Sequence, residues 1–268
     1  MQKNSNIVDT PYRLSVQVTL TGLSFLVSTQ KLKEAVYFSE KKFTSQYTPQ
    51  EILLEIKKEI ETNEIINQCY EVSIIYANTT YTLVPDSLFD KNRLSEYLKF
   101  NSKILSGDYL AYDTLALQKL HIVYVPFINI NNYLFETFGS FQYYHAATIL
   151  LQYVLEKEPS NSTTRAYIQV YTNHFDLVIL KDGALVLCNS YTYRTPEDLA
   201  YYVLFALEQL DLTADVIETK VLGDIEENDP NFAMLYTYIR NIAVLEVVNP
   251  LTITQRKPHQ QLLLKNCF

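Results

Sequence analysis

Hydrophobic and polar positions alternate with a period of two in several short stretches at the start of the chain. Residues 13–18 show the alternation clearly, residues 19–22 have the composition of a turn, and residues 23–28 and 34–39 continue as two further strands. The period then changes to that of a helix, with apolar side chains at Ile52, Leu53, Ile56 and Ile60. The pattern predicts a three-stranded meander followed by a helix that packs one face on the sheet.

The second half of the chain repeats this order. Three strands are predicted at residues 166–171, 175–180 and 184–191, and Asp182-Gly183 between the last two is a strong hairpin signal. The helix that follows has apolar residues at helical spacing from Leu199 to Leu210.

Both predicted helices begin with the same four-residue pattern, Thr-Pro-x-acid. The first is Thr48-Pro49-Gln50-Glu51 and the second is Thr195-Pro196-Glu197-Asp198. Threonine suits the N-cap, proline suits the first helical position, and an acid three residues after the cap closes a capping box. The recurrence indicates a duplicated α/β architecture, and we expect an actin-like (ribonuclease-H-like) fold with two lobes, each a mixed β-sheet flanked by helices.

The remaining elements complete the two lobes. Further strands are predicted at residues 72–76, 80–84, 120–127, 216–222 and 242–248, of which 120–127 reads as a buried central strand, and further helices at 85–98, 145–158 and 229–240. Residues 159–164 have the composition of an exposed loop. We therefore expect an N-terminal tail at 1–12, a first lobe at 13–143, a connecting helix and loop at 144–164, and a second lobe at 165–268.

Composition limits the classes of protein to consider. Of the 268 residues 48% are hydrophobic, yet no apolar run is long enough to span a membrane, and Met1–Asp9 is too polar for a secretory signal. Cys69, Cys188 and Cys267 lie far apart, which fits reduced thiols. We expect a cytoplasmic protein that does not insert into a membrane.

The net charge of −8 argues against direct binding to nucleic acid, because that affinity comes mostly from cations that neutralise phosphates. The densest basic cluster, from Lys31 to Lys42, is interleaved with Glu34 and Glu40, which is typical of a solvated strand edge. An unknown protein is therefore the expected partner.

From Arg13 to about Ala243 the chain resembles a bacterial family known as domain of unknown function 3822 (DUF3822). The residues that carry the resemblance are Leu14-Ser15-Val16, Thr21–Phe25, Val84-Pro85, His145–Thr148, Asn189–Tyr193, Pro196–Tyr202 and Gly223. This family is in turn similar to the superfamily of actin, sugar kinases and Hsp70, and especially to its bacterial pilus-assembly and cell-division branches. The resemblance also suggests an accessory role in ribosomal-RNA modification, because such proteins are often encoded near a ribosomal-RNA methyltransferase.

The superfamily resemblance implies a nucleotide site in a cleft between the lobes. Its positions here are Thr21 and Gly22 in the first hairpin, Asn173 in the second, and Gly223 with Asp224 beside the adenosine. The pattern is incomplete, since the chain has only five glycines, no acid in the first hairpin to bind magnesium, and no glycine in the second hairpin. We expect no cofactor, or at most weak or vestigial ATP binding.

Other routes to catalysis find little support in the sequence. No Walker loop, nucleophile elbow or HExxH motif is present, and the first strand lacks the carboxylates of a ribonuclease-H-type nuclease. His145 and His174 would make a metal site only by long-range convergence. Asp182 and Asp198 are explained by a turn and a cap, whereas Asp224, just after a strand, has no local role. We assign no catalytic and no metal-binding residue.

Tyrosines gather around the second Thr-Pro helix. The group comprises Asn189, Tyr191, Tyr193, Tyr201 and Tyr202. It is either a partner-binding surface of rigid amphipathic side chains or packing between strand and helix. The function we expect is a non-catalytic actin-like module that binds another protein. The alternative is a divergent ATP-dependent phosphotransferase or ATPase using Thr21, Gly22, Asn173 and Asp224.

Overall fold

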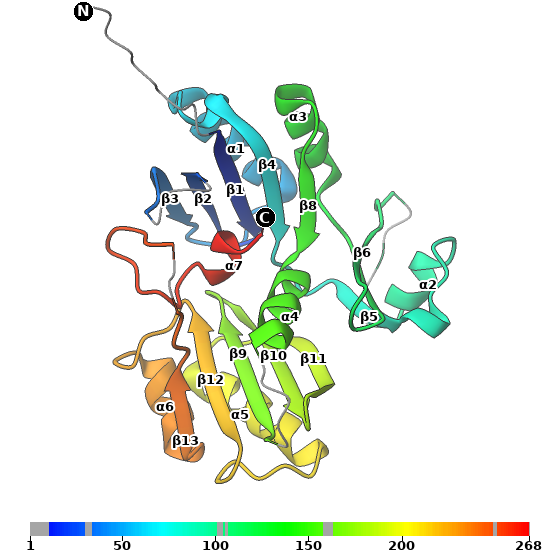
Figure 1. Ribbon diagram of the computed structural model, residues 1–268, viewed down its shortest axis with the longest axis vertical. Coiled ribbons are helices and arrows are strands. Elements are labelled where there is room, and N and C mark those ends of the chain that lie inside the picture. Colours follow the sequence, from blue (N-terminus) through cyan, green and yellow to red (C-terminus); the bar gives the residue numbers. More distant parts are fainter. Residues whose placement is uncertain are drawn as a thin grey trace, which may run out of the picture.

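A computed structural model describes residues 11–29, 34–100, 104, 107–157, 163–248 and 251–267. It contains two five-stranded sheets, one above the other in Figure 1, and a smaller three-stranded sheet to one side. The predicted tail at residues 1–12 and the predicted loop at 159–164 fall mostly outside the described residues.

The first sheet has the strand order β3-β2-β1-β4-β8. Its strands are β1 (Tyr12–Thr19), β2 (Gly22–Thr29), β3 (Tyr37–Lys42), β4 (Cys69–Tyr76) and β8 (Gln142–His145). The first three strands form an antiparallel meander, whereas β4 and β8 run parallel to β1. Helices α1 (Pro49–Thr62) and α3 (Ile128–Phe138) contact each other beside this sheet.

The second sheet repeats that order as β11-β10-β9-β12-β13. Its strands are β9 (Arg165–Val170), β10 (His174–Lys181), β11 (Ala184–Thr192), β12 (Glu218–Gly223) and β13 (Asn241–Val244), and its helices are α5 (Pro196–Gln209) and α6 (Pro230–Tyr238). The order corresponds strand by strand to that of the first sheet, with the same parallel and antiparallel pairings. The duplicated α/β architecture predicted from the sequence is therefore confirmed.

The two Thr-Pro motifs form equivalent caps. Thr48 accepts a hydrogen bond from the backbone of Glu51, whose side chain bonds back to Thr48, and Thr195 and Asp198 make the same reciprocal pair. Each helix then buries one face on its sheet, as the periodicity predicted. The Asp182-Gly183 hairpin is also formed, with both residues at positive φ.

A small subdomain is inserted between β4 and α3. Its sheet has the order β5-β7-β6, formed by β5 (Tyr81–Pro85), β6 (Ala111–Leu115) and β7 (Leu120–Tyr124). The predicted strand at 120–127 is thus central, but in this small sheet rather than in the main one. The sequence patterns did not single out β6, α3 or β8.

The helix predicted at residues 85–98 is wrong. The structure has a short 3-10 helix, η2 (Asp86–Leu88), and a separate five-residue helix, α2 (Leu94–Leu98). Between them the side chain of Asp90 accepts the backbone N–H of Asn92 at 2.9 Å, which stabilises a turn in place of a helix. A second 3-10 helix, η1 (Ile66–Gln68), precedes β4.

Helix α4 (Ala146–Lys157) connects the two halves and is buried along most of its length. It belongs to the same apolar cluster as Tyr167, Val178 and Leu180 of the second sheet, so it covers the inner face of that sheet. Figure 1 shows it below β8 and in front of β9 and β10. No described helix is long and apolar enough to cross a membrane.

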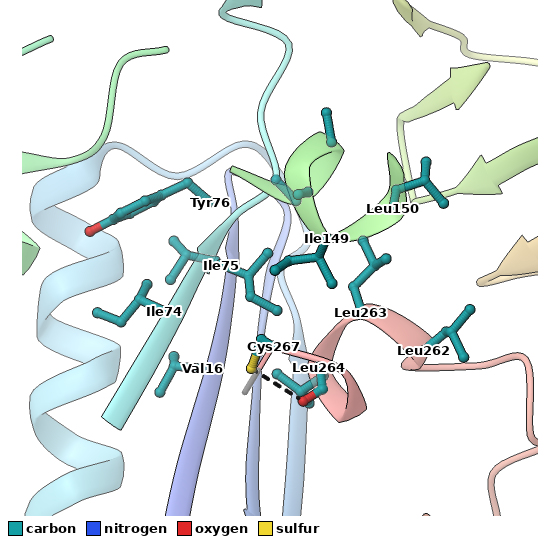
Figure 2. Packing of buried hydrophobic residues seen from close by; sticks show 14 of the residues in the cluster. Val16, Ile74, Ile75, Tyr76, Ile149, Leu150, Leu262, Leu263, Leu264 and Cys267 are labelled. Carbon is teal, nitrogen blue, oxygen red and sulfur yellow. Dashed lines mark hydrogen bonds between the residues drawn. The ribbon is translucent and has the colours of Figure 1, made fainter. Parts of the chain in front are cut away.

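The last described segment returns to the first sheet. Helix α7 (Leu262–Lys265) contacts β1, β2 and α4, although the chain has just completed β13 at the far edge of the second sheet. Figure 2 shows Leu263 of α7 beside Ile149 and Leu150 of α4, and Leu264 next to Cys267. The predicted domain ranges remain predictions, and the core around the first sheet includes Leu262, Leu263, Leu264 and Cys267.

Candidate functional site

A cleft of about 430 Å³ lies where the turns of the two sheets face each other. Both lobes and the C-terminal segment line it. Of the nucleotide-site residues predicted from the sequence, Gly22, Gly223 and Asp224 line this cleft, whereas Thr21 and Asn173 are not among its lining residues.

The first turn, between β1 and β2, uses its polar groups internally. Thr19 Oγ1 donates to the carbonyl of Gly22 at 3.0 Å and accepts from the backbone N–H of Thr21 at 3.2 Å. A Cβ on Gly22 would lie 2.8 Å from the carbonyl oxygen of Lys41 on β3. The close approach of β3 therefore explains why residue 22 is a glycine.

The second turn, between β9 and β10, is closed by side chains. Asn173 Oδ1 lies 3.0 Å from His174 Nδ1, and the Asn173 carbonyl accepts the backbone N–H of Tyr193 at 3.0 Å. The rings of Tyr171 and His174 stack at 4.3 Å. Asn173 thus joins this turn to the residues after β11, and its side chain is directed to His174.

Gly223 ends β12 with φ at +88°. A Cβ there would lie 2.3 Å from Gln169 Nε2 and 2.4 Å from the carbonyl oxygen of Val170. The next residue, Asp224, donates its backbone N–H to that same Val170 carbonyl at 2.8 Å. Gly223 therefore permits two strands to meet closely at the cleft.

Asp224 forms an ion pair across the cleft. Its Oδ2 lies 2.5 Å from Lys42 Nζ at the end of β3, so the pair joins the two lobes. The other cations that line the cleft are also paired, Lys41 with Glu55 and Arg256 with Glu40. Among the described lining residues, carboxylates outnumber cations, so the cleft offers no unpaired positive charge to a polyphosphate.

The C-terminal segment forms one wall of the cleft. Glu40 of the first lobe bonds Arg256 at 2.5 Å and Gln261 at 2.6 Å, while Glu226 of the second lobe bonds Lys257 at 2.9 Å. The Lys257 ammonium lowers the pKa of the Glu226 carboxyl. The segment is therefore attached to both lobes.

His259 anchors this segment to the end of β12. Its carbonyl accepts the backbone N–H of Gly223 at 3.1 Å, and its Nε2 lies 2.8 Å from the carbonyl oxygen of Ile225. Burial lowers the pKa of the ring, and because a carbonyl oxygen can only accept, Nε2 carries the proton that bonds Ile225. The sequence reading missed the role of residues 256–263, because the partners lie more than thirty positions away along the chain.

Two buried histidines, His145 and His174, lie near the junction of the lobes. Burial lowers their pKa values to about 3 and about 4. His145 Nε2 bonds the Asn78 carbonyl at 3.0 Å, and the neighbouring Asp176 accepts from Ser190 and Tyr171. In the described part of the chain no three His, Cys, Asp or Glu residues are grouped as metal ligands.

The tyrosine group is divided between core and surface. Tyr193 is buried and donates to the Tyr171 carbonyl at 2.7 Å, so it acts in packing. Tyr191 stacks between Phe175 and Tyr202, and Tyr201 reaches the surface. Asn189 is exposed on the neighbouring strand, β11.

Phe205 extends this aromatic ladder, although the sequence reading did not single it out. It stacks on Tyr201 at 6.0 Å, one turn along α5, and 45% of it is exposed. Its spacing of four residues from Tyr201 is the signal that could have identified it. We call the outer part of the ladder the α5 aromatic patch; it consists of the exposed Tyr201 and Phe205 and the half-buried Tyr202.

Comparisons with known proteins identify the fold and a family. The family model described as "Protein of unknown function (DUF3822)" matches residues 1–242. A Bacteroides thetaiotaomicron protein with an actin-like ATPase fold and unknown function is 18% identical, with 91% of this chain and 94% of that chain covered at a TM-score of 0.74. No curated protein matches the chain.

Two further structures share the fold at lower similarity. The PilM-PilN type IV pilus biogenesis complex is matched at 12% identity and a TM-score of 0.58, over 87% of this chain and 88% of that chain. The ethanolamine utilization protein EutJ from Carboxydothermus hydrogenoformans is matched at 8% identity and a TM-score of 0.51, over 96% and 88%. The actin-like fold expected from the sequence is thus confirmed.

Proposed function

We propose that this chain, which belongs to the DUF3822 family of proteins of unknown function and has an actin-like fold, is a non-catalytic module that acts by binding another protein. In this proposal the interlobe cleft is a structural joint and not a site of nucleotide turnover.

The paired charges of the cleft are the observation that carries the proposal. Magnesium-bound ATP remains an anion, and sites for it present backbone N–H groups, lysine or arginine to the phosphates. Here Lys42 and Arg256 are engaged by Asp224 and Glu40, and the turn at Tyr171–Asn173 carries side chains where a phosphate loop has glycine. Binding of a polyphosphate would require these pairs to break.

The α5 aromatic patch is the surface we propose for the protein partner. Tyr201 is 59% exposed and Phe205 45%, and both rings are held by stacking, so little side-chain entropy remains to be lost on binding. Asn189 and Tyr191 flank the patch on β11. PilM, whose structure was determined together with PilN, is an instance of this fold within a protein complex.

Calorimetric titration with magnesium-ATP tests the proposal for the cleft. We expect no binding heat from the wild-type protein up to millimolar ATP. A double variant, Asp224→Asn with Glu40→Gln, frees Lys42 and Arg256 and should gain weak affinity. Micromolar binding by the wild-type protein that is lost in Lys42→Ala, but kept in the exposed control Lys181→Ala, would instead favour the phosphotransferase alternative.

Co-purification tests the partner surface. The tagged full-length chain is expressed in the cells that naturally produce it, and co-purifying proteins are quantified by mass spectrometry. We expect a set of proteins that is lost from Tyr201→Ser with Phe205→Ser and kept by Tyr236→Ser with Tyr238→Ser, a matched pair of exposed aromatics on α6. Equal recovery by both variants would contradict the assignment of this face.

A further inference from the structure

Four strands form the outer edges of the two large sheets, β3 and β8 in the first and β11 and β13 in the second. A free strand edge can pair with another chain, and proteins protect such edges by shortness, charge or proline. β8 and β13 have four residues each, and β3 ends in Glu40-Lys41-Lys42. β11 has nine residues, and none of them is charged or a proline. It is therefore the described edge of these sheets that lacks such protection.

The pairing of β11 with β10 shows which of its backbone groups point outward. Just beyond the strand, the Tyr193 N–H donates to the Asn173 carbonyl at 3.0 Å. Bonded pairs alternate along an antiparallel ladder, so Tyr191 and Asn189 also bond β10. The residues between and beside them direct their N–H and C=O groups away from β10; these are Cys188, Ser190 and Thr192. No residue in the described part of the chain bonds these outward groups.

Other contacts of β11 do not use this edge. Tyr81 of the inserted subdomain reaches Cys188, but through its hydroxyl and the thiol, which lie 3.6 Å apart. The register shift at Ile179/Leu180 affects only the start of β11, and Leu187–Thr192 pairs regularly with β10. This regular stretch therefore has the geometry to bond a further antiparallel strand.

The charges beyond the two ends of β11 are complementary in an antiparallel arrangement. Lys181 and Asp182 precede the strand, Arg194 and Glu197 follow it, and all four are exposed. None of the four forms an ion pair with another described residue. When two β11 strands pair antiparallel, the start of one lies beside the end of the other. Asp182 then approaches Arg194 of the second copy, and the same contact occurs twice by symmetry.

We propose that two copies of this chain pair through β11, antiparallel and about a two-fold axis, and so join their second sheets into one continuous sheet. An uncharged strand can lie opposite itself without bringing like charges together. The assembly closes as a dimer, because each copy uses its one unprotected edge and the short β13 remains at the outside.

The symmetry also places the helices of the two copies. A two-fold axis that makes neighbouring strands antiparallel within one sheet is perpendicular to that sheet, so the same face of both copies points the same way. The two α5 aromatic patches therefore lie on one face of the joined sheet. The pairing itself uses backbone groups of β11, so it does not depend on the function proposed above.

Sedimentation equilibrium of the full-length chain tests the proposal. We expect a species of twice the 31.1 kDa mass of one chain, with a dissociation constant of roughly micromolar or below. Asn189→Lys brings like charges together near the two-fold axis and should weaken the dimer at least about tenfold. Asn241→Lys, at an exposed asparagine of the opposite edge strand β13, should leave it unchanged. A wild-type chain that stays monomeric at about 100 µM would overturn the proposal and leave the β11 edge to a strand of another protein.

A charge exchange tests the antiparallel direction. Arg194→Glu and Asp182→Lys should each weaken the dimer roughly fivefold, because each replaces two attractive contacts with two repulsive ones. The double variant should recover most of the wild-type affinity, and circular dichroism checks that all three variants are folded. A double variant weaker than both single ones would overturn the antiparallel pairing.

Hydrogen exchange tests whether the contact lies on the strand edge. The N–H groups of Ser190 and Thr192 should exchange fast in dilute solution and slowly once the dimer has formed. The Tyr191 N–H bonds β10 in both states, so its protection should not depend on concentration. A dimer in which Ser190 and Thr192 exchange as fast as in the monomer would overturn the proposal.

Discussion

Gly223 is the residue at which backbone conformation and packing act together. Its φ of +88° is costly for any residue with a Cβ, and that Cβ would also overlap Gln169 and the Val170 carbonyl. Gly183 has a similar φ, +75°, but open space around it. A comparison of the two glycines therefore separates the cost of the positive φ, which both share, from the cost of the close contact, which only Gly223 makes.

We therefore expect Gly223→Ala to lower the free energy of unfolding by more than about 3 kcal/mol and Gly183→Ala by about 1 kcal/mol. Urea denaturation followed by circular dichroism measures both. Equal losses in the two variants would show that the β9–β12 contact relaxes readily around a methyl group.

Asp176 makes stability depend on pH. Burial raises the pKa of its carboxyl from 3.8 to about 7 in the folded protein. Because the folded state then holds the proton more tightly than the unfolded state, the contribution of Asp176 is present in full below about pH 4. It is lost as the pH rises towards 7.

Asp176→Asn should remove this dependence. Relative to wild type, the free energy of unfolding of the variant should rise by roughly 1–3 kcal/mol between pH 5 and pH 8. Urea denaturation across this range provides the measurement, with Asp182→Asn in the exposed hairpin turn as the matched control. A constant difference over the range would mean that Asp176 titrates outside it.

Residue roles set by neighbours in the chain could be predicted from the sequence, whereas roles set by distant partners could not. Thr48 and Thr195 were identified as caps because the partner of each lies three positions away. Lys42 was interpreted as part of a solvated strand edge, since its partner, Asp224, is 182 positions distant. Asp224 lacked a local role for the same reason.

At the level of elements, the two capping boxes offer a test of the duplication. We expect Thr48→Ala and Thr195→Ala each to destabilise the fold by about 1 kcal/mol, because each removes one side-chain bond to a helix N-terminus. Their effects in the double variant should add, since the caps lie on separate lobes. Thermal denaturation measures all three variants, and a clearly unequal pair would show that the two caps are not energetically equivalent.

Elements with strong periodicity or clear caps were predicted, and the others were missed for physical reasons. β8 has four residues and β6 has five, which is too few for an alternation of hydrophobic and polar residues to stand out. The helix predicted at 85–98 was wrong because the side chains of Asp90 and Asn92 form a turn between η2 and α2. Short elements of this kind depend on the sheet that they join.

For the molecule as a whole, the repeated succession of strands and helices along the chain was predictable and the cleft was only partly so. The two predicted hairpins locate the turns that face the cleft, and Gly22, Gly223 and Asp224 do line it. The wall formed by residues 256–263 was not predicted, because a chain that crosses from one sheet to the other leaves no periodic signal.

Leu263 tests the importance of that crossing. It is buried against the first sheet and α4, so Leu263→Ala should cost about 2–5 kcal/mol. The loss should appear in hydrogen exchange as reduced protection of β1 and β2, with less change in β9 and β10. Equal loss of protection in both sheets would mean that the two lobes open together.

The return of α7 to the first sheet also fixes an order of events during synthesis. The ribosome makes β1 and β2 first, yet the core on which they rest needs Leu262, Leu263 and Leu264, which follow every strand of the second sheet. Domains generally fold in the order in which they emerge. Here every strand of the first sheet is made before any strand of the second, but the core of the first sheet stays incomplete until Leu262, Leu263 and Leu264 leave the exit tunnel, after all strands of the second sheet have been made.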